Sequence, residues 1–174
     1  MATTGPVELV VSGFPTPEGP AFDRDGNLYV GDRTGSIFKI SSSKEIFVFA
    51  TLEPSIAAYH LAFGFDDHLY VTGPTTSSFD SIYRVSPSGG VEKFFTGLGR
   101  PQGLAFDLEG QLYAVASYRG RRGIFRIRDP KKPELVVAGM SLVGLAFDQQ
   151  ENLMVVDSAS LYRVRVGIMG KPLP

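Results

Sequence analysis

Gly19-Pro20-Ala21-Phe22 opens a pattern that the chain repeats three more times, at His60-Leu61-Ala62-Phe63, Gly103-Leu104-Ala105-Phe106 and Gly144-Leu145-Ala146-Phe147. The four phenylalanines lie 41, 43 and 41 residues apart. A fixed period of this length is the signature of a repeat architecture, in which each repeat is one supersecondary unit. The sequence therefore predicts four similar units that pack on one another.

The first three predicted units each contain four short apolar runs joined by polar turns, and the fourth contains three such runs. In the first unit the turn 23–27 is followed by Leu28-Tyr29-Val30, then by the alternating run 37–40 and by a fourth run at 46–49. Successive residues of a strand face opposite ways, so the alternation is typical of a strand with one buried face. No segment carries a helical period, and β-branched and aromatic residues fill the runs. Four strands in about 40–45 residues is the size of a propeller blade.

We therefore predict an all-β fold, a four-bladed β-propeller that forms a single domain over residues 1–174. Its four-stranded antiparallel blades are expected at about 18–52, 57–97, 100–139 and 141–166.

The last blade is expected to be completed from the other end of the chain. Residues 8–12 (Glu-Leu-Val-Val-Ser) nearly repeat residues 134–138 (Glu-Leu-Val-Val-Ala), which are the fourth run of unit three, whereas unit four has only three runs. We predict that residues 8–12 pair with residues 161–164 and close the ring, which removes the open sheet edges. In the alternative, the chain is a fragment of a six-bladed propeller.

Composition sets limits on the chemistry. The net charge is −1, with 43% hydrophobic and 20% charged residues, which is ordinary for a globular protein. The chain has no cysteine, which excludes disulfides, thiol nucleophiles and zinc–cysteine sites. No apolar run approaches the roughly 20 residues of a membrane-spanning helix, so no membrane span is expected.

One stretch of the third unit is strongly basic. Between residues 118 and 132 it holds Arg119, Arg121, Arg122, Arg126, Arg128, Lys131 and Lys132, against Asp129 alone. Such a stretch suits phosphate, an acidic partner or nucleic acid, but it is more often a solvated edge and has no interleaved aromatic platform. We therefore expect no nucleic-acid partner, and retain Arg119 as a ligand-binding candidate.

Two runs resemble known propeller families. Residues 17–32 (Pro-Glu-Gly-Pro-Ala-Phe-Asp-Arg-Asp-Gly-Asn-Leu-Tyr-Val-Gly-Asp) resemble the opening of the gluconolactonase and senescence-marker-protein family, which includes regucalcin. Residues 100–107 (Arg-Pro-Gln-Gly-Leu-Ala-Phe-Asp) resemble the NHL-repeat pattern. The resemblance covers about residues 8–166 and implies a propeller.

The gluconolactonase resemblance also implies a metal. In that family a divalent cation, commonly calcium or zinc, sits in the central funnel and polarises a lactone carbonyl. Glu18 matches the ligand of the Glu-Gly-Pro motif, Gln102 stands where the family has Asn, and Val143 stands where it has Asp. Val143 has no oxygen to offer a hard cation. The resemblance thus implies Ca²⁺ or another divalent cation, with an incomplete set of ligands.

Ring closure predicts a second group of carboxylates. Asp32 and Asp157 end the second strands of units one and four, which become neighbours in a closed ring, so Glu18, Asp32 and Asp157 are expected to meet at one mouth. Three oxygen donors suffice to begin a calcium site, with Glu18, Gln102 and Asp157 as metal ligands, and Asp157 and Asp32 are the candidate acid and base. In the alternative, Asp32 and Asp157 cap turns.

The starts of the inner strands supply the other candidates. His60 replaces a glycine of the other three units and is a candidate general base, although a packed histidine is the common alternative. Tyr59, Gln102 and Arg119 are the candidate ligand-binding residues. The leading hypothesis is a propeller that binds a small molecule, carbohydrate or protein at its funnel mouth, as a monomer or homodimer. The competing hypothesis is a metal-dependent, lactonase-like hydrolase.

Overall fold

A computed structural model describes residues 7–77, 79–128 and 132–172, and within them the secondary structure is all β. The strands are β1 (Pro17–Phe22), β2 (Leu28–Asp32), β3 (Ser36–Ile40), β4 (Ile46–Thr51), β5 (His60–Phe63), β6 (Leu69–Thr72), β7 (Asp80–Val85), β8 (Val91–Leu98), β9 (Leu104–Phe106), β10 (Leu112–Tyr118), β11 (Arg121–Ile127), β12 (Glu134–Ala138), β13 (Gly144–Phe147), β14 (Asn152–Val156) and β15 (Leu161–Arg165).

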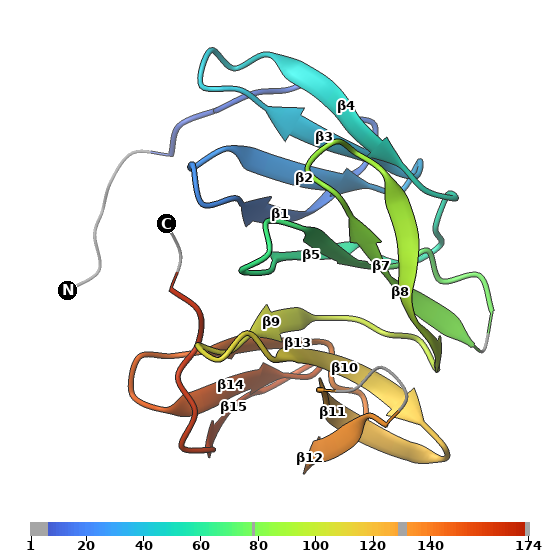
Figure 1. The fold of residues 1–174 in the computed structure, drawn as a ribbon, viewed down its shortest axis with the longest axis vertical. Coiled ribbons are helices and arrows are strands. Elements are labelled where there is room, and N and C mark those ends of the chain that lie inside the picture. The colour runs from blue at the N-terminus through green and yellow to red at the C-terminus, as the bar shows by residue number, and fades with distance from the viewer. Residues whose placement is uncertain (1–6, 78, 129–131, 173–174) are drawn as a thin grey trace.

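These strands form four antiparallel sheets in sequence order, which are the four predicted blades (Figure 1). Blade 1 is β1–β4, blade 2 is β5–β8, blade 3 is β9–β12 and blade 4 is β13–β15. Every connection within a blade is a hairpin, so each blade is a meander whose first strand lies innermost. The prediction of an all-β, four-bladed propeller is confirmed.

The predicted closing strand is wrong. Blade 4 has three strands, and residues 8–12 are not part of any sheet. Glu8 instead forms an ion pair with Lys44, in the turn between β3 and β4 (Nζ–Oε1 3.0 Å), and Phe14 lies against Phe38 of β3 with ring centroids 5.3 Å apart. The segment therefore follows blade 1, and β15 is left as an open edge.

A repeated aromatic pair explains why the Ala-Phe motif recurs. The tyrosine of the second strand of one blade packs edge-on against the motif phenylalanine of the next blade. The pairs are Tyr29–Phe63, Tyr70–Phe106 and Tyr113–Phe147, with centroid distances of 4.8, 5.0 and 4.9 Å. Each pair belongs to an apolar cluster that joins two successive blades.

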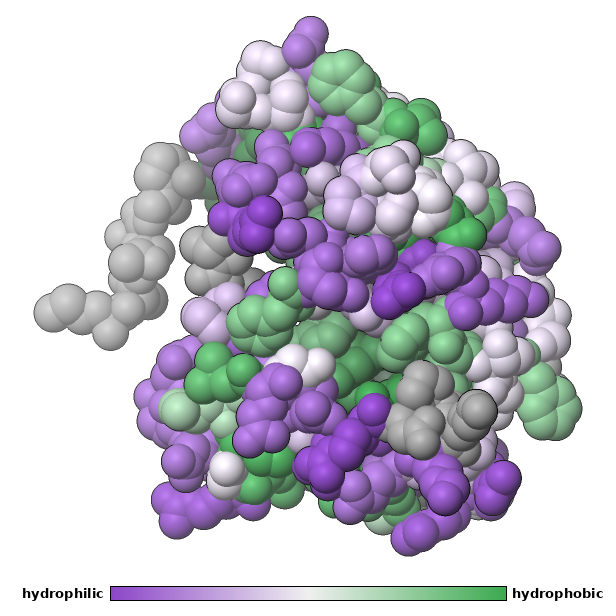
Figure 2. Space-filling model, in the orientation of Figure 1, coloured by the Kyte–Doolittle hydropathy of each residue, from purple (hydrophilic) through white to green (hydrophobic). Residues whose placement is uncertain are grey.

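Blades 1 and 4 lack such an interface among the described residues. The apolar clusters join blades 1 and 2, 2 and 3, and 3 and 4. Met154 stands at the tyrosine position of blade 4, and Phe22, the motif phenylalanine of blade 1, is 45% exposed. Figure 2 shows apolar residues as a green band across the middle of one face, between the half with blades 1 and 2 and the half with blades 3 and 4. The propeller is thus continuous through three interfaces and open at the fourth, which we call the seam.

Candidate ligand-binding mouth

The starts of the four inner strands surround one mouth of the central channel. All four blades contribute to a cavity of about 520 Å³, lined by Arg33, Ile56, Ala57, Ala58, His60, Arg100, Pro101, Gln102, Ser141, Leu142, Val143 and Ser158. Its volume lies in the range of small-molecule sites, roughly 300–1,000 Å³. Two arginines, a histidine, an amide and two hydroxyls share the lining with an apolar wall, so the mouth suits a ligand with both charged and apolar parts.

Glu18 of β1 is held by contacts to its own blade and to the start of blade 2. Its Oε1 accepts a hydrogen bond of 2.6 Å from Nε of Arg33, which follows β2, and its Oε2 accepts one of 3.3 Å from the Tyr59 backbone N–H. The local backbone fixes this position, because a bulge separates the Glu18↔Gly31 pair from Pro20↔Val30. Gly19, at the bulge, has φ +52° and no room for a Cβ, which would lie 2.2 Å from the Tyr59 carbonyl oxygen. Glu18 is therefore the acidic half of an ion pair.

Arg100 is held in an unusual backbone conformation. Its φ is +46°, although it directly precedes Pro101, where an extended conformation is normal. Both flanks are paired to β10. Gly99 N–H donates to the Ser117 carbonyl (2.7 Å), and Gln102 N–H donates to the Val115 carbonyl (2.8 Å). Arg100 and Pro101, between these anchors, are left out of the pairing with β10, and the exposed Arg100 lies at the mouth. Strained positions of this kind concentrate at ligand sites.

His60 and Gln102 complete the polar lining. His60 begins β5 and is partly buried, and this burial lowers its pKa despite the nearby carboxylate of Glu18, which acts to raise it. The ring is therefore neutral near pH 7. The Gln102 backbone carbonyl accepts a hydrogen bond of 2.7 Å from Thr72 Oγ1, which fixes its main chain while the partly exposed side chain lines the cavity.

The predicted acidic cluster is not formed. Asp32 is fully buried and caps the turn after β2, since its carboxylate accepts hydrogen bonds from Thr16 N–H (2.7 Å), Thr34 N–H (2.9 Å) and Thr34 Oγ1 (2.7 Å). Burial alone would raise the pKa of Asp32, but these hydrogen bonds outweigh it and hold the pKa below its ordinary value. With its carboxylate committed to the turn, Asp32 is not available as an acid or base at the mouth.

Asp157 caps the equivalent turn of blade 4. It accepts hydrogen bonds from the Ala159 and Ser160 N–H groups (2.8 and 2.7 Å), and these, with one from Tyr162 Oη, lower its pKa. Within the described part of the chain, no three His, Asp or Glu side chains are placed to hold a metal ion. The expected meeting of Glu18 with two aspartates required a closed seam, and the open seam keeps blades 1 and 4 apart.

The donors at this mouth do not fit a divalent metal. The positions equivalent to Glu18 in the other blades are Tyr59, Gln102 and Val143, so the ring offers one carboxylate and one amide. That carboxylate is already paired with the Arg33 guanidinium, whereas a hard cation takes six or more oxygen ligands. The residues implied as ligands by the gluconolactonase resemblance therefore make no cation site here.

Two predicted ligand residues lie elsewhere. Tyr59 is only 1% exposed, and its hydroxyl donates to the Glu53 carbonyl, so it is a core residue. Arg119 occupies the tip of the β10–β11 hairpin, with its guanidinium 5.2 Å from the centre of the Tyr118 ring, and does not line the mouth. Lys131 and Asp129, in the same basic stretch, lie outside the described residues.

Sequence reasoning missed the two arginines that dominate the mouth. Arg33 directly follows Asp32, and Arg100 lies two residues before Gln102, so both adjoin positions that the repeat alignment singles out. Comparing the residues around each equivalent position, as well as the position itself, would have found them.

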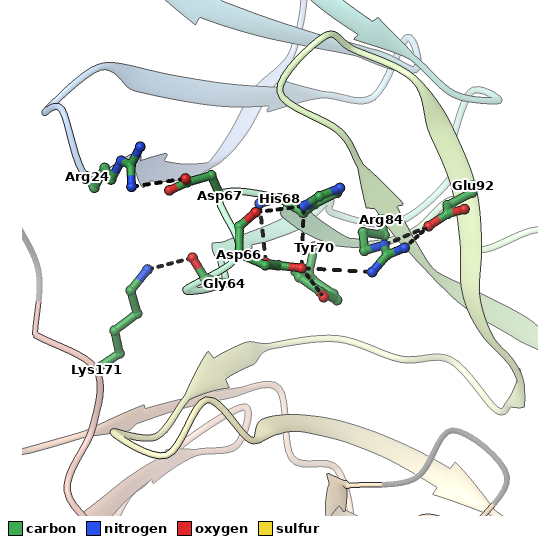
Figure 3. A network of polar contacts seen from close by, with 9 residues as sticks. All are labelled: Arg24, Gly64, Asp66, Asp67, His68, Tyr70, Arg84, Glu92 and Lys171. Carbon is green, nitrogen blue, oxygen red and sulfur yellow. Dashed lines mark hydrogen bonds and ion pairs between the residues drawn. The ribbon is translucent and has the colours of Figure 1, made fainter.

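The C-terminal segment, residues 167–172, lies at the other end of the channel. Lys171 donates from its backbone N–H to the Phe106 carbonyl (2.9 Å) and from Nζ to the carbonyls of Phe63 (2.8 Å) and Gly64 (3.0 Å). Figure 3 shows Lys171 reaching Gly64, beside a polar network around Asp66. The carbonyl contacts commit this lysine to holding the segment on blades 2 and 3, and a smaller cavity of about 260 Å³ lies between this segment and the inner strands.

The comparisons with known proteins place the fold. A family model described as "Strictosidine synthase-like, N-terminal" matches residues 13–40, which span β1, β2 and β3. No curated protein sequence matches the chain at a significant level. The match is short, and it covers the Glu-Gly-Pro bulge and the Asp32 turn.

Solved structures resemble the whole chain. The PQQ-bound aldose sugar dehydrogenase of Streptomyces coelicolor is 19% identical (TM-score 0.71), with 92% of this chain and 63% of that one covered. A gluconolactonase from Xanthomonas campestris is 17% identical (TM-score 0.64), with 90% and 62% covered. Virginiamycin B lyase from Staphylococcus aureus is 17% identical (TM-score 0.62), with 88% and 50% covered.

These matches show a β-propeller. Gluconolactonases are among the proteins that share it, as the resemblance in residues 17–32 predicted. This chain spans between half and two thirds of the length of those three structures. Within the described residues there is no helix with the length and hydrophobicity needed to cross a bilayer.

Proposed function

We propose that this propeller binds a small hydroxylated anion, of the size of a sugar acid, at the mouth lined by Arg33 and Arg100. The observation that carries the proposal is the charge balance of the mouth. Arg33 of blade 1 and Arg100 of blade 3 both line it, and Glu18 pairs with Arg33 alone. Guanidinium groups recognise planar carboxylates and phosphates with paired hydrogen bonds.

The other lining groups support a hydroxylated ligand. Gln102, Ser141 and Ser158 offer amide and hydroxyl groups, while Leu142 and Val143 form an apolar wall. Neighbours that share the fold include an aldose sugar dehydrogenase and a gluconolactonase, whose names refer to sugars. A polyol carboxylate combines the charge and the hydroxyl groups that this lining can satisfy.

Calorimetric titration with sodium gluconate tests the proposal, with sorbitol as the neutral polyol of similar size. We expect gluconate to bind and sorbitol not to. Arg100→Ala should weaken gluconate binding by about tenfold or more, because a charge-assisted hydrogen bond contributes about 1.5–3 kcal/mol. Arg119→Ala is the matched control, since it removes an arginine that lies outside the mouth. Equal binding of sorbitol, or equal loss in the two variants, would contradict the proposal.

Glu18→Gln separates anion binding from the metal-dependent hydrolase. Removing the carboxylate frees Arg33, so this variant should bind gluconate more tightly than the unaltered protein. If Glu18 were instead a ligand of a catalytic cation, the unaltered protein would bind Ca²⁺ in calorimetry and the variant would not. We expect no calcium heat with either protein, because the donor set does not fit the ion.

His60 gives the binding a pH dependence. Its lowered pKa keeps the ring neutral near pH 7, and protonation at lower pH adds a third positive charge beside Arg33 and Arg100. Gluconate affinity should therefore rise as the pH falls toward the pKa of His60, which burial holds below the ordinary histidine value of about 6.5. In His60→Gln this rise should be absent, which titrations at several pH values will show.

A further inference from the structure

Blade 4 presents an unpaired strand whose equivalent in blade 3 is buried. Leu161 and Tyr162 of β15 are 64% and 45% exposed, whereas Ile124 and Phe125, at the same positions of β11, are 0% and 1% exposed. Ile124 packs in the apolar cluster that joins blades 3 and 4, and Phe125 in the one that joins blades 2 and 3, whereas β15 is the last strand of its sheet and lies in the blade that borders the open seam. An open edge with apolar side chains is a template for another strand.

Residues 8–12 have the sequence of the missing strand. They read Glu-Leu-Val-Val-Ser, against Glu-Leu-Val-Val-Ala in β12. In the structure they belong to no sheet, and Leu9 and Val10 are 74% and 49% exposed. Within the described part of the chain, residues 8–12 make a side-chain polar contact through Glu8, which forms an exposed ion pair with Lys44. An apolar strand-forming segment and an apolar strand edge are thus both uncovered in one chain.

Charged residues indicate a register for the pairing of residues 8–12 with β15. In blades 2 and 3 an arginine of the third strand lies directly opposite a glutamate of the fourth, as Arg84↔Glu92 and Arg126↔Glu134, and each pair forms an ion pair of 2.5 Å. Arg163 holds the same position in β15, and within the described residues it is in no salt bridge. The β11–β12 register transferred to blade 4 sets Glu8 opposite Arg163.

The segment and the edge lie on different blades. In Figure 1 residues 7–14 run beside blade 1 at the top, and β15 lies at the bottom. Phe14 is anchored on Phe38, and just before it Gly13 has φ +110° with open space around its Cβ position. A change of backbone direction at Gly13 would therefore release residues 8–12 without disturbing blade 1.

We infer that two copies of this chain exchange these segments, so that residues 8–12 of each form the fourth strand of blade 4 in the other. The exchange is reciprocal and produces a two-fold dimer. It also carries the partner's blade 1 to the exposed side of blade 4. There the partner's Phe22 would face Met154. These two residues stand at the positions that the phenylalanine and the tyrosine occupy in the three packed interfaces. One interaction thereby covers both the open edge and the open seam.

Light scattering after size-exclusion chromatography gives the first test. The full chain should have twice its mass of 18.8 kDa at high micromolar concentration. Arg163→Glu should shift it to the monomer, by placing two carboxylates opposite each other. The double variant Glu8→Arg/Arg163→Glu should restore the dimer. The control Glu45→Arg/Arg163→Glu has the same net charge and should stay monomeric. A monomeric full chain, or rescue by the control, would overturn the inference.

Cysteine cross-linking distinguishes exchange from any other dimer. The chain has no cysteine, so Val11→Cys/Leu161→Cys introduces two thiols, at positions that the β11–β12 register makes neighbours (Ile124↔Val137). Oxidation should give a disulfide-linked dimer on a non-reducing gel. The control Val48→Cys/Leu161→Cys pairs two exposed positions that the exchange does not bring together, and it should not cross-link. A disulfide within one chain, no cross-link, or equal cross-linking of the control would each overturn the inference.

Discussion

The three packed blade interfaces and the open seam are built from the same sequence motif. Phe63, Phe106 and Phe147 each lie edge-on against a tyrosine of the preceding blade, whereas Phe22 has no such partner and is 45% exposed. The Ala-Phe pair occurs in all four units. The burial of its phenylalanine therefore depends on which blade lies beside it. A repeat therefore specifies a blade, and the neighbouring blade determines what that blade contributes to stability.

The largest effect should come from removing a motif phenylalanine at a packed interface, compared with removing the one at the open seam. Phe106 is 8% exposed within the cluster that joins blades 2 and 3, so Phe106→Ala should lower the free energy of unfolding by about 3–5 kcal/mol. Phe22→Ala should cost under about 1 kcal/mol in the monomer, because the side chain is already half in water. Urea denaturation at low chain concentration measures both, and equal losses would show that the seam is closed in solution.

The two turn-capping aspartates sharpen the comparison. Asp32→Ala removes a fully buried carboxylate together with its hydrogen bonds from Thr16 and Thr34, so we expect a loss of about 2–3 kcal/mol at pH 7. Asp157→Ala removes a partly exposed cap beside the seam and should cost clearly less.

The Asp32 effect should depend on pH. Because the folded pKa of Asp32 lies below its ordinary value, its stabilisation is present above about pH 3.9 and is lost as the pH falls through the folded pKa. The stability of the unaltered protein and of Asp32→Ala should therefore converge in acid. A constant difference between pH 7 and pH 3 would show that the charge of Asp32 is not what stabilises the turn.

Much of this architecture was accessible from sequence, and the reason lies in the motif phenylalanines. Their spacing reports a packing interaction that recurs once per blade, so period and blade boundaries follow from it. The closing strand was predicted from a true likeness between residues 8–12 and β12, but likeness specifies a strand type and not its partner. Asp32 and Asp157 failed as site residues for a related reason, since hydrogen bonds within each turn commit their carboxylates locally.

The charge of the mouth was not predictable from the repeats. Arg100 projects there because a two-residue bulge with a left-handed residue interrupts the approach to β9. No period reports an irregularity of this kind. The Glu18–Arg33 ion pair likewise depends on how the chain leaves β2 and passes beside the bulge of β1.

A smaller effect is expected from the contact that attaches the C-terminal segment, which follows blade 4, to blade 2. Lys171 Nζ donates to two backbone carbonyls of blade 2, so Lys171→Ala should lower stability by about 1–2 kcal/mol. Hydrogen exchange should become faster at Leu108 N–H, which donates to the Met169 carbonyl of the same C-terminal segment. Lys93→Ala, at an exposed lysine of β8, is the control. Unchanged exchange at Leu108 would mean that the segment is held without the lysine.

The smallest effect on stability should follow from removing the contact that holds residues 8–12 beside blade 1. The ion pair of Lys44 with Glu8 is exposed on both sides, and such pairs contribute about 0–1 kcal/mol, so Lys44→Ala should leave the urea midpoint nearly unchanged. The same substitution releases Glu8 in the monomer only, because the exchanged dimer sets Glu8 opposite Arg163. The dimer fraction at a fixed chain concentration should therefore increase by a small factor, and higher salt should abolish the difference, since an exposed pair is screened. A lower dimer fraction in Lys44→Ala would indicate that the segment stays on blade 1 when two chains associate, and that the seam is covered in another way.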